Sequence, residues 1–175
     1  MKNRRHYIIF DKTKHNTHEL LFLTKIDSMN TIKNIFLADD DDEDSFLFEE
    51  ALKEINKTVF LTIADNGEDL SNKLNKTTIA PQIIFLDLNM PIKNGFDCLD
   101  EIRSSSVYRN TPVVVLSTSG SEYSVNTSYN KGADMYIQKP DNYKDLKKAI
   151  NICLTKDWGN YSRPPGDDFF LRLHN

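Results

Sequence analysis

The sequence is poor in several residues and patterns, and each absence excludes a class of protein. It contains only two cysteines, Cys98 and Cys153, which lack metal-ligand spacing and are expected to be packed, reduced thiols. No apolar run approaches the roughly 18 residues of a membrane span. The net charge of -4 provides no basic excess, so nucleic acid is not an expected partner. We therefore expect a cytoplasmic protein without membrane insertion.

The length of 175 residues predicts one domain with appended segments. Residues 1–31 are net basic, and three interpretations stay open for them: an added strand or helix, a flexible arm, or sequence upstream of the true start at Met29. Residues 32–157 form the expected domain. Residues 158–175 form a tail, too short for a further domain, whose apolar Phe169–Leu171 segment either folds back on the body or contacts a partner.

Hydrophobic patterning predicts alternating strands and helices. The expected strands cover 35–38, 59–64, 83–86, 112–116 and 134–138, and the expected helices cover 44–57, 67–74, 96–105, 122–131 and 143–156. Right-handed crossovers between such elements place helices on both faces of a sheet. The fold class is therefore α/β, with a doubly wound five-stranded parallel sheet.

Polar groups follow four of these five strands. Asp39 and Asp40 follow the first, Asp87 the third, Ser117 the fourth and Lys139 the fifth. Because parallel strands end on one edge of the sheet, these side chains are expected to converge in one crevice. Carboxylates crowded together repel each other unless a counter-charge is present, and a divalent cation with oxygen ligands, Mg²⁺ above all, supplies one.

A metal beside an acid, a lysine and a hydroxyl is typical of phosphoryl transfer. The metal and Lys139 neutralise charge on the phosphoryl oxygens, and Ser117 donates a hydrogen bond to one of them. Asp87 stands alone on the central strand and is the natural nucleophile, which would form an acyl phosphate.

These motifs carry a resemblance to a known family. They are the pair Asp39-Asp40, the stretch Leu86-Asp87-Leu88-Asn89-Met90-Pro91 with Gly95, Ser117, and Tyr136 with Lys139-Pro140. In this order and spacing, the chain from Ile32 to about Lys156 resembles the receiver domain of two-component response regulators, the CheY-like family, in its stand-alone form. The resemblance implies a flavodoxin-like strand order of 2-1-3-4-5.

The resemblance also implies a metal site and a phosphoacceptor. Asp87 would accept a phosphoryl group from the phosphohistidine of a partner kinase. Asp40 and Asp87 would bind Mg²⁺ directly, Asp39 partly through water, and the backbone carbonyl of Asn89 would complete the site.

A switch is implied as well. Ser117 would turn toward the phosphoryl group, Tyr136 would follow from an outward to an inward rotamer, and Lys139 would pair with the phosphate. The peptide bond between Lys139 and Pro140 is expected to be cis. The chain departs from the family pattern at Thr118, where a small residue is usual, and the effect of a threonine there on phosphoryl access or on the switch stays open.

Two further departures are conservative or local. Ser117 replaces the commoner threonine and keeps the hydroxyl. Asp141 stands where many relatives have an apolar residue, so the start of the last helix is open to change.

The function that follows is a phosphoacceptor response regulator in a phosphorelay, which carries phosphate stoichiometrically and is not an enzyme. Its partners would be a sensor histidine kinase or phosphotransfer protein and a downstream target protein, and a homodimer stays open. The alternative is a Mg²⁺-dependent phosphatase of the haloacid dehalogenase type. That family needs an acid two residues after the nucleophile, where this chain has Asn89; starting from Asp39 instead supplies Asp41 but leaves Asp87 without a purpose.

Overall fold

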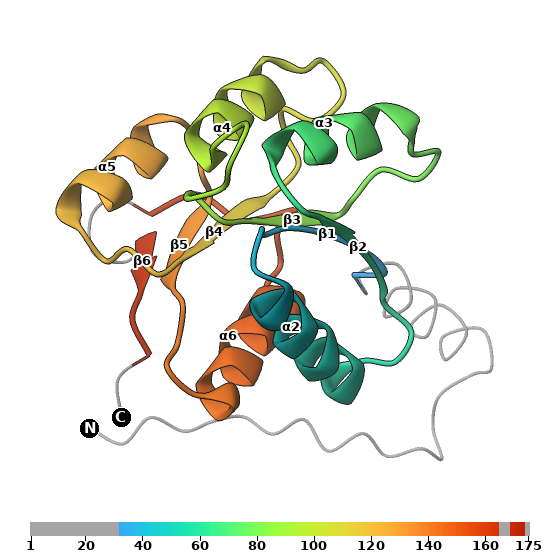
Figure 1. Ribbon diagram of the computed structural model, residues 1–175, viewed down its shortest axis with the longest axis vertical. Coiled ribbons are helices and arrows are strands. Elements are labelled where there is room, and N and C mark those ends of the chain that lie inside the picture. The colour runs from blue at the N-terminus through green and yellow to red at the C-terminus, as the bar shows by residue number, and fades with distance from the viewer. Residues whose placement is uncertain (1–31, 165–168, 174–175) are drawn as a thin grey trace, which may run out of the picture. The chain divides into compact units, whose positions relative to one another are not determined.

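A parallel sheet with helices on both faces makes up the part of the chain that the computed structural model describes, residues 32–164 and 169–173 (Figure 1). The strands are β1 (Asn34–Ala38), β2 (Phe60–Ala64), β3 (Ile83–Leu86), β4 (Val113–Ser117), β5 (Met135–Gln138) and β6 (Phe170–Leu171). The helices are α2 (Asp42–Ile55), α3 (Gly67–Lys76), α4 (Gly95–Ser104), α5 (Glu122–Asn130) and α6 (Tyr143–Thr155). The three interpretations of residues 1–31 concern sequence outside the described residues.

The strand order is β2-β1-β3-β4-β5-β6, and every pairing is parallel. The predicted order 2-1-3-4-5 is confirmed, and within the described residues a short sixth strand, β6, adds to the five predicted strands. β3 lies between β1 and β4, with Ile84 opposite Phe36 on one side and Val113 on the other. All four residues of β3 are buried, as its uninterrupted apolar run predicts.

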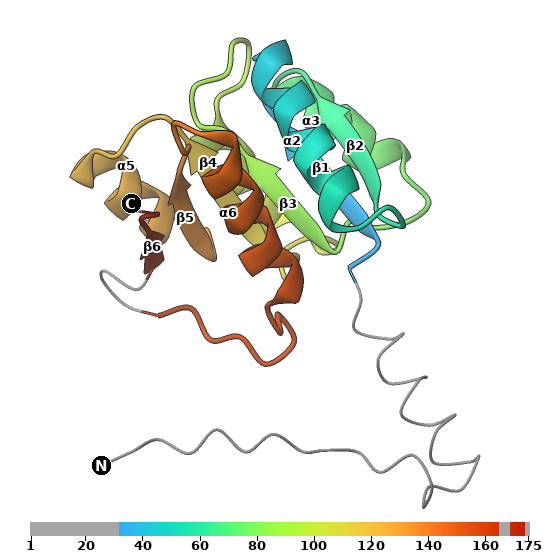
Figure 2. The ribbon, with the colours of Figure 1, turned by 90° about the horizontal axis from the view of Figure 1, so that it is seen from below.

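Helices α3, α4 and α5 cover one face of the sheet, and α2 and α6 cover the other (Figures 1 and 2). Successive residues of β3 point to opposite faces, so Ile84 and Leu86 join the core beneath α3–α5, whereas Ile83 and Phe85 join the core beneath α2 and α6. A strand with a core on each side needs apolar residues at every position. The strand therefore ends where the apolar run ends, at Leu86, and the polar residue Asp87 follows it.

Each helix starts at a short polar side chain that caps its first turn. The N-caps of α2 to α6 are, in order, Asp41, Asn66, Asn94, Ser121 and Asn142. α2 starts two residues earlier than predicted because Asp41 caps it. α6 starts at Tyr143 as predicted, so Asp141 does not alter the beginning of this helix.

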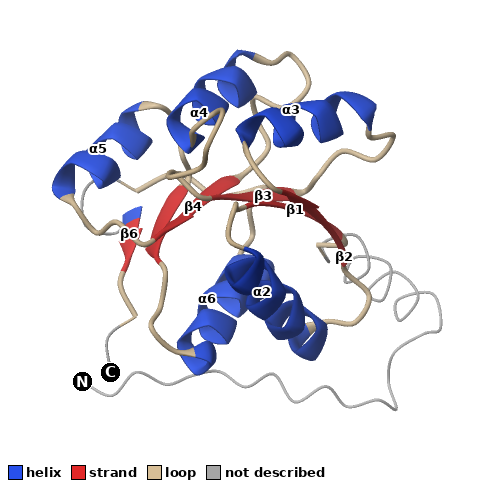
Figure 3. Cartoon of the chain, in the orientation of Figure 1, coloured by secondary structure: helices blue, strands red, loops and turns tan. Residues whose placement is uncertain are grey.

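The tail folds back on the body, which is one of the two outcomes that the sequence leaves open (Figure 3). The Tyr161 hydroxyl donates a 2.8 Å hydrogen bond to the carbonyl of Asp134, and Arg163 donates one of 2.7 Å to the carbonyl of Tyr129. Phe169 is only 1% exposed and belongs to the core under α5. The β6 strand that follows supplies the sixth strand of the sheet.

Both cysteines are free and buried, as expected. Burial raises the pKa of the Cys98 thiol to about 11 and that of Cys153 to about 12, which keeps both in the unreactive thiol form. None of the helices within the described ranges has the length and apolar character needed to cross a membrane.

Candidate functional site

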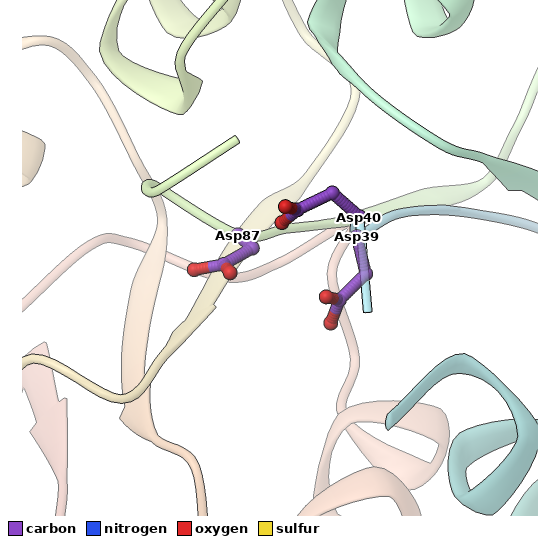
Figure 4. Close-up of side chains that lie close together, drawn as sticks. All are labelled: Asp39, Asp40 and Asp87. Carbon is purple, nitrogen blue, oxygen red and sulfur yellow. The ribbon is translucent and has the colours of Figure 1, made fainter. Parts of the chain in front are cut away.

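Three carboxylates meet at the carboxyl edge of the central strands. Asp39 and Asp40 follow β1, Asp87 follows β3, and one oxygen of each lies within 4.8 Å of the others (Figure 4). Asp39 and Asp87 are 4% and 5% exposed, whereas Asp40 is exposed to solvent. The predicted convergence of these acids is therefore present in the fold. Two buried carboxylates carry an electrostatic cost, and an exposed third one leaves the cluster accessible.

The backbone around Asp87 fixes its side chain. Its amide donates to the carbonyl of Ala38 at 2.9 Å, and its Oδ1 accepts from the amides of Leu88 at 2.6 Å and Asn89 at 3.4 Å. The loop passes so close that a Cβ on Gly95 would lie 2.2 Å from the Asp87 carbonyl oxygen. Gly95 is thus required by the close approach of α4 to the site.

Lys139 brings a positive charge to the acids from the end of β5. Its Nζ lies 2.8 Å from Asp39 Oδ2, 2.7 Å from Asp44 Oδ2 and 3.4 Å from Asp87 Oδ2. Its backbone amide donates to the carbonyl of Ser117 at 2.8 Å. Burial opposes the charge of Lys139, but hydrogen bonds to Asp39 and Asp44 outweigh it, and the pKa of the lysine is raised above its ordinary value.

Asp39 is the most perturbed acid of the cluster. Burial raises its pKa to about 6, against the lowering effect of its hydrogen bond to Lys139. Its Oδ1 also accepts from the amide of Asp41 at 3.2 Å. The negative charge of ionised Asp39 is therefore only partly compensated by the groups of the protein around it.

The donor set fits a hard divalent cation. The converging ligands are all carboxylate oxygens, which suit Mg²⁺, Mn²⁺ or Ca²⁺ and not the softer metals that prefer sulfur and imidazole. The lysine compensates part of the negative charge, and a cation held by Asp39, Asp40 and Asp87 would compensate the rest.

Ser117 is the last residue of β4, which pairs with β3, and Tyr136 lies on the following strand, β5. Ser117 is fully buried, and its Oγ accepts from the amide of Ser119 at 3.4 Å. Tyr136 is fully buried, and its hydroxyl donates a 2.6 Å hydrogen bond to the carbonyl of Ser119. Thr118 is exposed, and the question whether it impairs phosphorylation stays open.

The expected cis peptide bond before Pro140 is wrong for this structure. No described peptide bond is cis, so the bond between Lys139 and Pro140 is trans. The trans form is intrinsically the more stable one even before proline. In this form, the Lys139 ammonium still reaches Asp39 and Asp87.

Sequence reasoning missed two parts of the site. Asp44 is one of several acids at the start of α2, where acids favour the helix dipole, and nothing in the sequence marks it as a partner of Lys139, yet it makes one of the two shortest ion pairs of this lysine. The tail residues Phe169 and Phe170 pack against the ring of Tyr136, with centroids 6.4 and 5.2 Å away. Neither contact follows from a local pattern, because both join segments that are far apart in the chain.

Comparison with known proteins assigns the chain to a family. The model of the response regulator receiver domain matches residues 35–151. Response regulator Rcp1 of Synechocystis sp. is 36% identical over 129 residues, which cover 71% of this chain and 88% of Rcp1. The chain belongs to the response regulator receiver domain family, the phosphoacceptor class of two-component signalling.

Solved structures agree with this assignment. A phosphorylated cyanobacterial phytochrome response regulator, RcpA, is 31% identical with a TM-score of 0.67, over 77% of this chain and 99% of that one. The Mn²⁺-bound form of Rcp1 is 33% identical with a TM-score of 0.65, over 75% and 99%. A Dictyostelium discoideum cyclic-nucleotide phosphodiesterase is 31% identical over only 16% of its length, so its activity belongs to that protein. Rcp1, which is similar to this chain, thus binds a divalent metal ion.

The phosphatase alternative has no support. Position 89 is an asparagine, and the side chain of Asp41, the other candidate acid, is occupied as a helix cap that accepts from the amides of Glu43 and Asp44 at 2.9 and 3.1 Å. Asp41 therefore has a structural role at the start of α2.

Proposed function

We propose that this chain is a phosphorelay response regulator that accepts a phosphoryl group on Asp87 and in consequence changes its binding to a protein partner. The observation that carries the proposal is the position of Asp87 at the end of the central strand, where Lys139 and the paired acids Asp39 and Asp40 surround it. The receiver domain comprises residues 32–157, with residues 1–31 and 158–175 as appended segments.

In the transfer step, a carboxylate oxygen of Asp87 forms a bond to phosphorus, and the bond from phosphorus to the donor breaks. The donor is the phosphohistidine of a sensor kinase or phosphotransfer protein in the cytoplasm. Backbone amides of Leu88 and Asn89 hold the other oxygen of Asp87 in place. Lys139 keeps its proton and neutralises charge on the transferred group. The chain is a stoichiometric phosphoacceptor and not an enzyme with turnover.

The metal is proposed to be Mg²⁺, which would neutralise charge on the phosphoryl oxygens when bound. Asp40 and Asp87 would hold it directly, Asp39 partly through water, and the backbone carbonyl of Asn89 would complete the set. Ser117 would donate a hydrogen bond to the phosphoryl group, and Tyr136 would respond to its movement. A downstream target protein would read the altered surface around β4, β5 and the neighbouring helices.

Intact-mass spectrometry after incubation with Mg²⁺ and acetyl phosphate tests the proposal. The expected result is one phosphate on the wild type, dependent on Mg²⁺ and lost with time. The Asp87→Asn variant, which keeps the shape of the side chain, should gain none. Equal labelling of wild type and variant would place the phosphate elsewhere and overturn the assignment.

A further inference from the structure

Lys139 has more acidic partners than the phosphoacceptor site requires. Its two shortest ion pairs go to Asp44 at 2.7 Å and Asp39 at 2.8 Å, while Asp87 is 3.4 Å away. The lysine side chain is 11% exposed and that of Asp44 is 40% exposed, so the contact with Asp44 is partly open to water, whereas the contact with Asp39 is buried. The ammonium group of Lys139 therefore lies closer to Asp44 and Asp39 than to Asp87, the residue proposed to be phosphorylated.

Asp44 is not needed for the start of its helix. Asp41 is the N-cap, and Asp42 and Glu43 already place negative charge in the first turn. Neither Asp42 nor Glu43 forms an ion pair with any described residue, whereas Asp44 reaches Lys139 across a sequence separation of 95 residues. The contact with Lys139 thus distinguishes Asp44 from its acidic neighbours.

We propose that Asp44 is a positioning residue that holds Lys139 in the resting state and thereby restrains phosphorylation of Asp87. This inference rests on the proposed function. As the bond from Asp87 to phosphorus forms and the donor leaves, Lys139 keeps its proton and moves from Asp44 toward the new phosphoryl oxygens. Asp44 opposes the transfer because it competes with the phosphoryl oxygens for the ammonium of Lys139.

The test compares phosphorylation rates of Asp44→Asn and wild type, followed by intact mass with acetyl phosphate at a Mg²⁺ concentration shown to saturate each protein. One unit charge removed at several ångströms is expected to accelerate phosphorylation roughly three- to tenfold. The matched control is Asp42→Asn, which removes the same charge from the same helical turn without touching Lys139. Its rate should stay within about twofold of wild type, since exposed charges are screened.

A double-mutant cycle with Lys139→Gln separates positioning from a general charge effect. If Asp44 acts through Lys139, then Asp44→Asn changes the rate little when the lysine is absent. A full acceleration in the Lys139→Gln background, or equal rates for Asp44→Asn and Asp42→Asn, would overturn the inference. A slower Asp44→Asn would also overturn it, since the carboxylate would then assist the lysine.

The same labelling experiment distinguishes a failure of the proposed function from a failure of the role of Asp44. If the wild type gains no phosphate at all, the proposed function is wrong. If the wild type is labelled on Asp87 while Asp44→Asn behaves like its control, only the role of Asp44 is wrong.

Discussion

The ring of Tyr136 meets the ring of Phe170 edge to face, with centroids 5.2 Å apart and planes inclined by 74°. The same two residues are register partners of β5 and β6. The Tyr136 hydroxyl is held at the other end by the carbonyl of Ser119 at 2.6 Å. The residue proposed to respond to phosphorylation is thus fixed by the loop after β4 and covered by the tail. A change in its rotamer has to disturb a contact with the tail.

The tail should contribute to the stability of the domain through Phe169. Phe169→Ala removes a fully buried ring that packs on Tyr129 at 5.1 Å, and a loss of about 3–5 kcal/mol in the free energy of unfolding is expected. Phe170 is only partly buried, so Phe170→Ala should cost clearly less. Urea denaturation of both variants provides the measurement. Equal stability of Phe169→Ala and wild type would mean that the tail does not pack in solution as it does here.

The glycine at position 95 should be irreplaceable. In Gly95→Ala the new Cβ would stand 2.2 Å from the backbone oxygen of Asp87, so the loop that carries the acid has to shift. A loss of about 1–3 kcal/mol in stability, typical of overpacking, is expected together with slower labelling of Asp87. Gly159→Ala is the control, because its nearest atom outside the adjacent residues lies 3.5 Å away. If Gly95→Ala folded and labelled as well as this control, the close approach would carry no constraint.

The site divides into a part that the sequence predicts and a part that it does not. Asp39, Asp40, Asp87, Ser117 and Lys139 each follow a recognisable buried strand, and the geometry of a parallel sheet brings such positions to one edge. The contact of Asp44 with Lys139 depends instead on the phase of α2. Within the run of six consecutive acids, the N-cap at Asp41 sets the phase of α2 and so decides which acid of its first turn faces the lysine, and this phase leaves no signal in composition.

The tail eludes sequence reasoning for a different reason. β6 has only two residues, too few for any periodic pattern. Its pairing with β5 joins Phe170 to Tyr136 across a long separation in the chain. An apolar tail is compatible with either folding back or binding a partner, and only tertiary packing decides between them.

Burial of Asp39 should make the metal-free protein less stable as the pH rises. The pKa of Asp39 is about 6 in the folded state against an ordinary value of 3.8, so between these values the folded state binds more protons than the unfolded state. Stability from this group is therefore lost as the pH increases through that window. Asp39→Asn removes the charge, and the variant should be more stable than wild type by about 1–3 kcal/mol near neutral pH.

Below about pH 3 this advantage should vanish, because Asp39 is then largely neutral in both states. Urea titrations at several pH values, in the presence of a chelator, give the comparison. Asp42→Asn is an exposed control that should show no comparable gain. A constant difference between Asp39→Asn and wild type across the whole pH range would contradict the link to titration of this carboxyl group.

Divalent cations should stabilise the protein through the same cluster. A ligand at roughly a hundred times its Kd that binds only the folded state adds about 2.7 kcal/mol, which corresponds to a Tm increase on the order of 5–10 °C for a domain of this size. Asp40→Asn removes one of the three carboxylates and is exposed, so it should fold normally but lose most of this increase. Asp42→Asn, which lies outside the cluster, should keep it. Thermal denaturation with and without Mg²⁺ measures the effect. If Asp40→Asn retained the full Tm increase, the cation would bind elsewhere on the chain, and the acids after β1 would not be its ligands.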